Sequence, residues 1–349
     1  MYNEIFVFAL GTSFVLLFSW AFKTLPRENW QILATIPWTK DTRGNWQGLN
    51  ITYYGFFIAL ATSVAVAILL ILTSSIGVPI STTFLLAVFI LLIGLITSKV
   101  IASLVENKPY TFTIAGACFS GVFIVPPTVW ALDHLNPAGS FSVPPIPMMA
   151  ALAIAYTFGE GLGRLACISF GCCYGKPLSH CRPNIARFLG KYVFVFTGKM
   201  KKIAYESGLD GQRVVPVQAM TALLHVAAGL VTICLFLKGH FTSALMIAMV
   251  STQCWRVLSE TLRADFRGHQ KFTAYQMMAL VSIPYVFLSA SLLSGLASPT
   301  PDIKVGVGAL WDPAAILFIE IAGLATFLWT GRSMVTASTI SFRVMKDRI

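Results

Sequence analysis

The chain has 349 residues, of which 56% are hydrophobic and only 11% are charged, and its formal net charge is +11. A mean hydropathy of +0.75 excludes an ordinary soluble domain and predicts an integral membrane protein. The basic excess favours contact with anionic lipid headgroups, and nothing further in the sequence supports binding to nucleic acid.

Nine apolar segments are long enough to cross a bilayer, because a hydrocarbon core of about 30 Å takes about 20 helical residues. In chain order we expect spans at residues 4–23, 51–73, 80–104, 110–132, 147–172, 214–237, 242–262, 274–297 and 311–331. The first has no basic region before it and no small-residue cleavage pattern after it, so we interpret it as a retained helix. A Pro- and Gly-rich break at 133–146 separates the fourth and fifth spans. The predicted fold class is an all-α, polytopic transmembrane helical bundle of about nine spans.

The 25 basic residues are distributed very unevenly over this topology. All except Lys238 and Lys304 fall on or near one face, which receives residues 24–50, 105–109, 175–213, 263–273 and the tail after 331. The positive-inside rule then predicts a cytoplasmic C-terminus and an external N-terminus.

The loop at 176–213 carries the alternating stretch YVFVF, then TGK, then MKKIAYE. This pattern predicts a short surface hairpin with its turn at Thr197 to Lys199. Such a hairpin is either a lid over a cavity or a surface loop that touches headgroups.

Seven cysteines, an odd number, occur mostly inside the predicted helices, so a disulfide framework is not expected. Cys172, Cys173, His180 and Cys181 offer four soft ligands, but adjacent cysteines lack the usual spacing of a zinc site. We therefore expect no metal and no cofactor, and we interpret the cysteines as small packing residues.

The seventh span carries the strongest polar signal, in CWRVLSETLRADFRG at residues 254–268. Arg256, Glu260, Arg263 and Arg267 share one helical face. One interpretation is an ion ladder that neutralises itself, in which Glu260 pairs with the arginines on either side. The other is a phosphate site, because guanidinium groups bind phosphate oxygens in a bidentate manner.

Other spans bring polar groups to the same membrane face. In GLGRLACISFGCCYGKP, residues 161–177, Arg164 is expected to pair with Glu160, and Gly163 allows close approach of a ligand. His225, in the middle of the sixth span, is expected to be a packing residue away from this face. The remaining residues expected to contribute to substrate binding are Tyr54, Cys172, Gln218 and Gln276.

These stretches resemble the prolipoprotein diacylglyceryl transferase family. GRLACISFGCCYGKP resembles the family's GRxGN signature in a variant that ends GCCYG, and TYYGFFIAL resembles its WYG helix. KYVFVFTGKMKKIAYESGLDG resembles the family's head region, VPVQAM its HPxQLYE, WRVLSETLRAD its FRxxxExxR and QMMALVSIP its GQxLSIP. The motifs agree in order and spacing over about residues 51–297.

The resemblance implies a lipid transferase that moves the diacylglyceryl group of phosphatidylglycerol to a cysteine thiol of a lipoprotein precursor. Arg164, Arg256 and Arg263 would hold the phosphate that leaves as glycerol phosphate, since the departing charge needs stabilisation in a dry site. Glu260 would act as a base or orienting residue for the thiol, or would only fix the arginines.

The chain departs from the family pattern at its polar positions. The family's HGG stretch aligns near TIAGACFSG at residues 113–121, where no histidine occurs. The signature asparagine falls on Cys167, its glutamate on Cys172, and the histidine of HPxQ on Val215. Cys172 or Cys173 as a transient acceptor is therefore an alternative to a non-functional replacement.

The expected organisation is an extra N-terminal helix and basic loop at 1–50, a transferase-like core at 51–297 with its head loop at 176–213, and an extra C-terminal helix and basic tail at 298–349. The resemblance implies a multi-pass protein of a bacterial-type inner membrane with a site open to the outer side, whereas the charge distribution places the same motifs on the cytoplasmic side. The alternatives are a glycerolipid transferase with a non-protein acceptor, a lipid or solute transporter, and a noncatalytic membrane scaffold.

Overall fold

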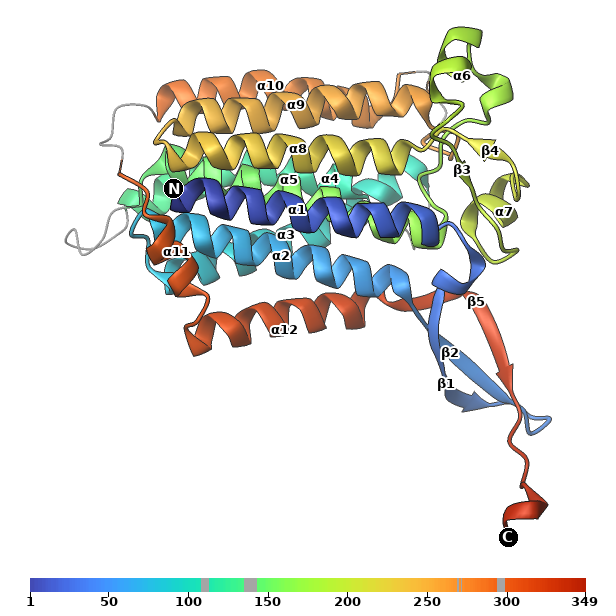
Figure 1. Cartoon of the computed structure of the whole chain (residues 1–349). Coiled ribbons are helices and arrows are strands. Elements are labelled where there is room, and N and C mark those ends of the chain that lie inside the picture. Colours follow the sequence, from blue (N-terminus) through green and yellow to red (C-terminus); the bar gives the residue numbers. More distant parts are fainter. Residues whose placement is uncertain (108–112, 135–142, 269, 271, 294–298) are drawn as a thin grey trace.

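A computed structural model describes residues 1–349 except 108–112, 135–142, 269, 271 and 294–298. Within these residues, nine long helices are found, and they lie side by side (Figure 1). They are α1 (Tyr2–Thr24), α2 (Tyr53–Ser75), α3 (Ile80–Glu106), α4 (Ile114–His134), α5 (Pro145–Phe170), α8 (Val217–Leu237), α9 (Phe241–Leu262), α10 (Ala274–Leu292) and α12 (Pro313–Thr330). Three short helices complete the set, namely α6 (Pro183–Leu189), α7 (Lys202–Ser207) and α11 (Ile303–Ala309). The predicted all-α membrane bundle is confirmed.

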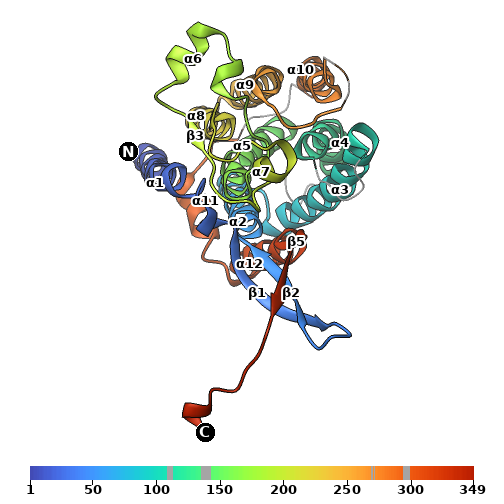
Figure 2. The same ribbon diagram turned by 90° about the vertical axis from the view of Figure 1, so that its right-hand side faces the viewer.

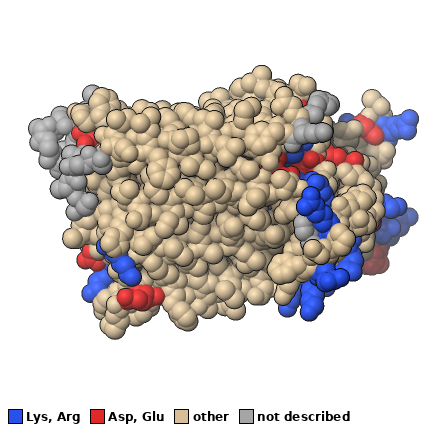
Figure 3. All heavy atoms as spheres, turned by 90° about the horizontal axis from the view of Figure 1, so that it is seen from above, with Lys and Arg blue, Asp and Glu red and all other residues tan. Residues whose placement is uncertain are grey.

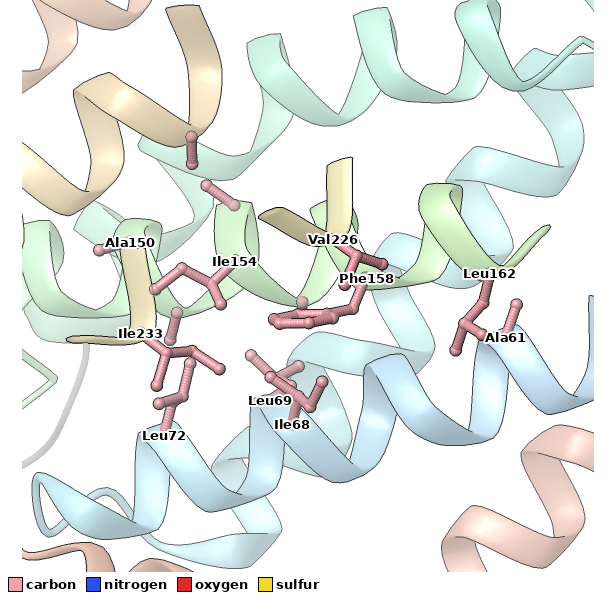
Figure 4. Packing of buried hydrophobic residues seen from close by; sticks show 14 of the residues in the cluster. Ala61, Ile68, Leu69, Leu72, Ala150, Ile154, Phe158, Leu162, Val226 and Ile233 are labelled. Carbon is pink, nitrogen blue, oxygen red and sulfur yellow. The ribbon is translucent and has the colours of Figure 1, made fainter. Parts of the chain in front are cut away.

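Helix α5 lies in the centre of the bundle, surrounded by α2, α4, α8 and α9 (Figure 2). Its residues Ile154, Phe158 and Leu162 pack between side chains of α2 and α8 (Figure 4). A Cβ atom at Gly229 of α8 would come within 2.6 Å of the Phe158 ring. This glycine therefore lets α8 lie close against α5, as small residues do between membrane helices.

Eight of the nine long helices are apolar enough to cross a membrane by length and composition, within the described residues. Helix α9 is as long as the others but is not among them, because it carries Gln253, Arg256 and Glu260. It lies alongside α8 and α10 for its full length (Figure 1). The strands directly before α2 and after α12 pair in one sheet, so both lie on the same side of the membrane. The chain between them must therefore cross the membrane an even number of times. With α9 counted, eight helices separate these strands, so α9 completes the bundle as a spanning helix.

The segments expected as a basic loop at 24–50 and a basic tail after 331 instead form a sheet. Strand β1 (Ile32–Lys40) pairs antiparallel with β2 (Trp46–Thr52), and β2 pairs antiparallel with β5 (Arg332–Ile340). The sheet projects from one end of the bundle (Figure 1). The two ends of the chain thus satisfy each other's backbone hydrogen bonds, which a sequence pattern does not reveal when the partners are so far apart.

The expected hairpin in the head loop is wrong in its second half. Only β3 (Phe194–Val195) is extended, and its partner is β4 (Arg213–Val214) rather than MKKIAYE, which contains helix α7. Lys201 precedes this helix and is fully buried, where its Nζ donates hydrogen bonds to the carbonyl oxygens of Ser169 (2.6 Å) and Leu25 (3.2 Å). Lys201 therefore ties the head region to the ends of α1 and α5.

Charged side chains gather at the two ends of the molecule and leave a broad uncharged band between them (Figure 3). The end that carries the sheet and the head region holds most of the blue surface. At the other end, Lys304 lies over the ring of Tyr2 at 4.0 Å. The expected break at 133–146 and the outer parts of the spans at 110–132 and 274–297 fall partly outside the described residues.

Candidate functional site

A cluster of buried polar side chains lies where α5, α8 and α9 approach the head region, and we call it the inner cluster: Tyr156, Glu160, Arg164, His225 and Arg256. Glu160 is at its centre, about 15 Å along the helix axis from the end of α5. One carboxylate oxygen accepts a hydrogen bond from Nη2 of Arg164, and the other accepts one from Nη2 of Arg256 at 2.6 Å. Tyr156 donates to the same carboxylate and accepts from Arg256 at 2.7 Å. A single carboxylate therefore joins two guanidinium groups from separate helices.

The inner cluster carries more positive than negative charge, and some of its hydrogen-bond donors have no acceptor among the described residues. The side chains of Glu160, Arg164 and Arg256 are 2%, 11% and 9% exposed, so their charges are largely removed from water. Two guanidinium groups face one carboxylate, which leaves one positive charge in excess. Among the described residues, the buried Nε–H groups of Arg164 and Arg256 have no hydrogen-bond acceptor. Unpaired buried donors are costly, so this arrangement favours an anionic ligand.

A small polar cavity opens beside the inner cluster. Gln218 lies in its wall, where its Nε2 donates to the carbonyl oxygen of Cys172 at 2.9 Å and its Oε1 has no partner among the described residues. The cavity is lined by Glu160, Arg164, Cys173, Val217, Gln218, Thr221, His225, Trp255, Arg256, Ser259, Glu260 and Arg263. Arg164 and Arg256 thus both line this cavity.

His225 lies in this cavity, so its expected position away from the polar face is wrong. Its Nδ1 is 4.0 Å from Oε2 of Glu160 and has no hydrogen-bond partner among the described residues. The error has a simple cause, since α8 crosses α5 at the depth of Glu160 and Gly161. A Cβ atom at Gly161 would come within 3.3 Å of Cβ of His225. This close approach brings the imidazole to the carboxylate.

A second group of charges, the outer cluster, lies nearer the end of α9: Glu106, Glu260, Arg263, Asp265, Arg267 and Tyr275. Both oxygens of Glu260 accept from Arg267, at 3.1 and 3.3 Å, and one lies 3.5 Å from Nη1 of Arg263. Arg267 also donates to Glu106 at 3.1 Å and stacks 4.0 Å above the ring of Tyr275. The expected pairing of Glu260 with Arg256 is therefore wrong, because Arg256 turns across to Glu160.

Arg263 connects the outer cluster to the cavity. It ends α9, and its Nε donates to Oδ1 of Asp265 at 2.8 Å, while Nη2 donates to the other oxygen. Asp265 and the nearby thiol of Cys173 raise the pKa of Arg263 further above its usual range, although burial acts against this. Arg263 is thus a fixed cation in the cavity wall.

Three thiol groups meet beside Arg263. The sulfur atoms of Cys167, Cys172 and Cys173 all lie within 4.8 Å of one another. This group differs from the four residues considered in the sequence, because it contains Cys167 and neither His180 nor Cys181. Hydrogen bonds from the other two thiols, together with the charges of Arg263 and Arg164, hold the pKa of Cys173 well below its usual range.

Four of the residues expected in the site do not line the cavity: Cys172, described above with the other thiols, and Tyr54, Gly163 and Gln276. Tyr54 packs edge-on against Phe170, with ring centroids 5.7 Å apart. Gln276 closes the capping box of α10 with Thr273, and its Nε2 donates to Val257 at 3.0 Å. Gly163 faces Ile58 of α2. These residues position the helices around the site.

Tyr156 was absent from the residues expected in the site, although a signal for it exists. It precedes Glu160 by four residues and Arg164 by eight, so all three share one face of α5.

A model of the prolipoprotein diacylglyceryl transferase family matches residues 45–294. No curated protein matches the chain. The matched range contains both charge clusters, the three thiols and the head region, and it excludes α1, β1, α11, α12 and β5.

Proposed function

Because the chain belongs to the prolipoprotein diacylglyceryl transferase family, we propose that it transfers the diacylglyceryl group of phosphatidylglycerol to a cysteine thiol of a lipoprotein precursor. It would do so as a multi-pass protein of a bacterial-type inner membrane. Its partners are then an anionic phospholipid and a precursor peptide that carries the acceptor thiol.

The observation that supports this proposal is the pair of unpaired Nε–H groups on Arg164 and Arg256. A phosphate brings oxygen acceptors and negative charge, which are the two things that this buried cluster lacks. Arg263 adds a third cation in the cavity wall. A phosphodiester headgroup bound here would have its glyceryl carbon within the cavity and its acyl chains along the apolar helices.

Glu260 acts in this proposal as a residue that positions Arg263, rather than as a base. Its two oxygens already accept hydrogen bonds from Arg267. Glu160 positions Arg164 and Arg256 in the same way. Gln218 and Cys172 hold the chain after α5 against the start of α8.

The transfer is a displacement at the glyceryl carbon. The acceptor sulfur forms a bond to this carbon while the bond to the phosphate oxygen breaks, and that oxygen leaves with the electron pair as glycerol phosphate. Arg164, Arg256 and Arg263 stabilise the leaving charge, which develops in a site with little water. His225 takes the thiol proton at its unpaired Nδ1.

The test is release of glycerol phosphate from labelled phosphatidylglycerol by purified protein in lipid nanodiscs, with and without a precursor peptide that carries a single cysteine. We expect release that depends on the peptide, and a lipidated peptide as the second product. Substitution of the peptide cysteine by serine is the matched control. Turnover without a lipidated peptide would contradict the proposed acceptor, and no turnover at all would contradict the reaction.

A further inference from the structure

The chain turns sharply after α5 and places the side chains of Cys167, Cys172 and Cys173 close together. Gly171 and Cys173 have φ angles of +72° and +54°, and the amide of Cys172 donates to the carbonyl oxygen of Cys167 at 3.0 Å. A left-handed conformation is uncommon for a residue other than glycine. Here it directs residues 172 and 173 back toward the last turn of α5, where Cys167 is buried.

We infer that Cys167, Cys172 and Cys173 form a three-thiolate site for a thiophilic divalent metal ion such as Zn²⁺, with a fourth ligand position open to the cavity. Zinc–sulfur bonds of about 2.3 Å place the sulfur ligands of a tetrahedral site about 3.8 Å apart. The three sulfur atoms lie within 4.8 Å of one another, so small side-chain rotations bring them to this spacing.

The surroundings fit such a centre in charge as well as in distance. Three thiolates around a divalent ion have a net charge of about −1. Arg164 and Arg263 line the same cavity as Cys173, and two cations beside the site offset this charge. A cluster of thiols that served only as packing would not require buried guanidinium groups next to it.

The fourth position follows from the arrangement of the ligands. Among the described residues, the group that can hold a metal contains three potential ligands and no fourth. Cys173 lies in the cavity wall, whereas Cys167 is buried in α5 and does not line the cavity. Three protein ligands and one exchangeable position are typical of catalytic zinc, whereas structural zinc sites have four protein ligands.

This inference rests on the proposed function for the identity of the fourth ligand, which is the acceptor thiol. Coordination by a metal ion deprotonates a thiol, and the released proton passes to His225. The thiolate keeps its electron pair for the new carbon–sulfur bond, and the phosphate leaves with the pair from the broken carbon–oxygen bond. No oxidant or reductant is needed.

The test is metal binding by the full-length protein, measured independently of turnover. Protein purified under reducing conditions is loaded with Zn²⁺ or Co²⁺, desalted and analysed for metal content, and the Co²⁺ form is examined for thiolate charge-transfer absorption. We expect about one ion per chain, and a shift of the Co²⁺ absorption when a cysteine-containing peptide is added. Separate Cys167→Ser, Cys172→Ser and Cys173→Ser variants should each weaken binding at least about tenfold. Cys181→Ser and Cys234→Ser, at part-buried thiols outside the group, should bind as the parent does.

Three outcomes would overturn the inference. The first is a metal content that does not change when Cys167, Cys172 and Cys173 are all replaced by serine. The others are folded protein that binds no ion, and a disulfide bond among the three cysteines after purification under reducing conditions. Thermal unfolding without metal, repeated with alanine variants, identifies any variant that fails to fold. Lipid turnover by protein that binds no metal would refute the metal site and support the proposed function. One bound ion per chain without lipid turnover would support the metal site and refute the proposed function.

Discussion

The inner and outer clusters differ in how fully their charges are paired, although both include residues of α9. In the outer cluster the oxygens of Glu260 and the donors of Arg263 and Arg267 find partners among the described residues. In the inner cluster, Nε of Arg164, Nε of Arg256 and Nδ1 of His225 do not. Paired buried charges fix the ends of helices, whereas unpaired buried donors indicate where a ligand binds. We therefore expect the inner cluster, together with Arg263, to bind the substrate, and the rest of the outer cluster to contribute mainly to stability.

Glu160→Gln should have the largest effect, because it removes the carboxylate that both inner guanidinium groups share. Loss of one partner from a buried ion pair costs about 3–5 kcal/mol in the free energy of unfolding. We expect a large fall in thermal stability together with loss of lipid turnover, measured by intrinsic fluorescence and by glycerol phosphate release. Addition of phosphatidylglycerol should restore part of the lost stability. A variant as stable as the parent would contradict the central position of Glu160.

Arg256→Ala should lower kcat/KM for phosphatidylglycerol by about 10²–10³, the usual effect of removing one donor that stabilises developing charge. Arg256→Lys is the matched variant, since it retains the charge and loses the planar pair of donors. We expect it to recover only a small part of the activity. Full activity of the lysine variant would mean that charge alone is sufficient.

Arg267→Gln tests whether the outer cluster contributes to stability without contributing to turnover. It breaks contacts to Glu106 and Glu260 in the outer cluster but does not line the cavity. We expect the free energy of unfolding to fall by about 1–3 kcal/mol. The same preparation should show kcat/KM within about threefold of the parent, which corresponds to less than about 0.7 kcal/mol. A loss of turnover as large as that of Arg256→Ala would show that the two clusters do not divide these roles.

Lys201 should give a smaller effect that depends on pH. Burial lowers its pKa to about 7, although Glu28 and Cys172 oppose this shift. In the unfolded chain its pKa is about 10.4, so the unfolded state binds more protons between about pH 7 and pH 10. Stability contributed through this group therefore rises with pH across that window and is constant below it. The midpoint of thermal unfolding should increase from pH 7 to pH 9 in the parent, and Lys201→Met should flatten this increase.

The sequence predicts the helices and one ion pair well, because both depend on local spacing. Long apolar runs define the spans, and the interval of four residues between Glu160 and Arg164 defines their pairing. The same rule paired Arg256 with Glu260 and was wrong there, since contact between α9 and α5 offers Arg256 another carboxylate. His225 was misplaced for the same reason, because the crossing point of two helices is not encoded in either one alone. The sheet of β1, β2 and β5 depends on segments from opposite ends of the chain, so a local pattern could show at most its first hairpin.

The closure of this sheet also constrains how the protein is made. Strand β5 emerges from the ribosome only after every membrane-crossing helix has been synthesised, so the outer edge of β2 remains without its neighbour throughout insertion. Unpaired strand edges can pair with other chains, so we expect this edge of β2 to be open to such pairing until β5 has been synthesised. Once paired, β5 ties the segment that follows α12 to the segment that precedes α2, so the sheet can close only after α12 has been inserted.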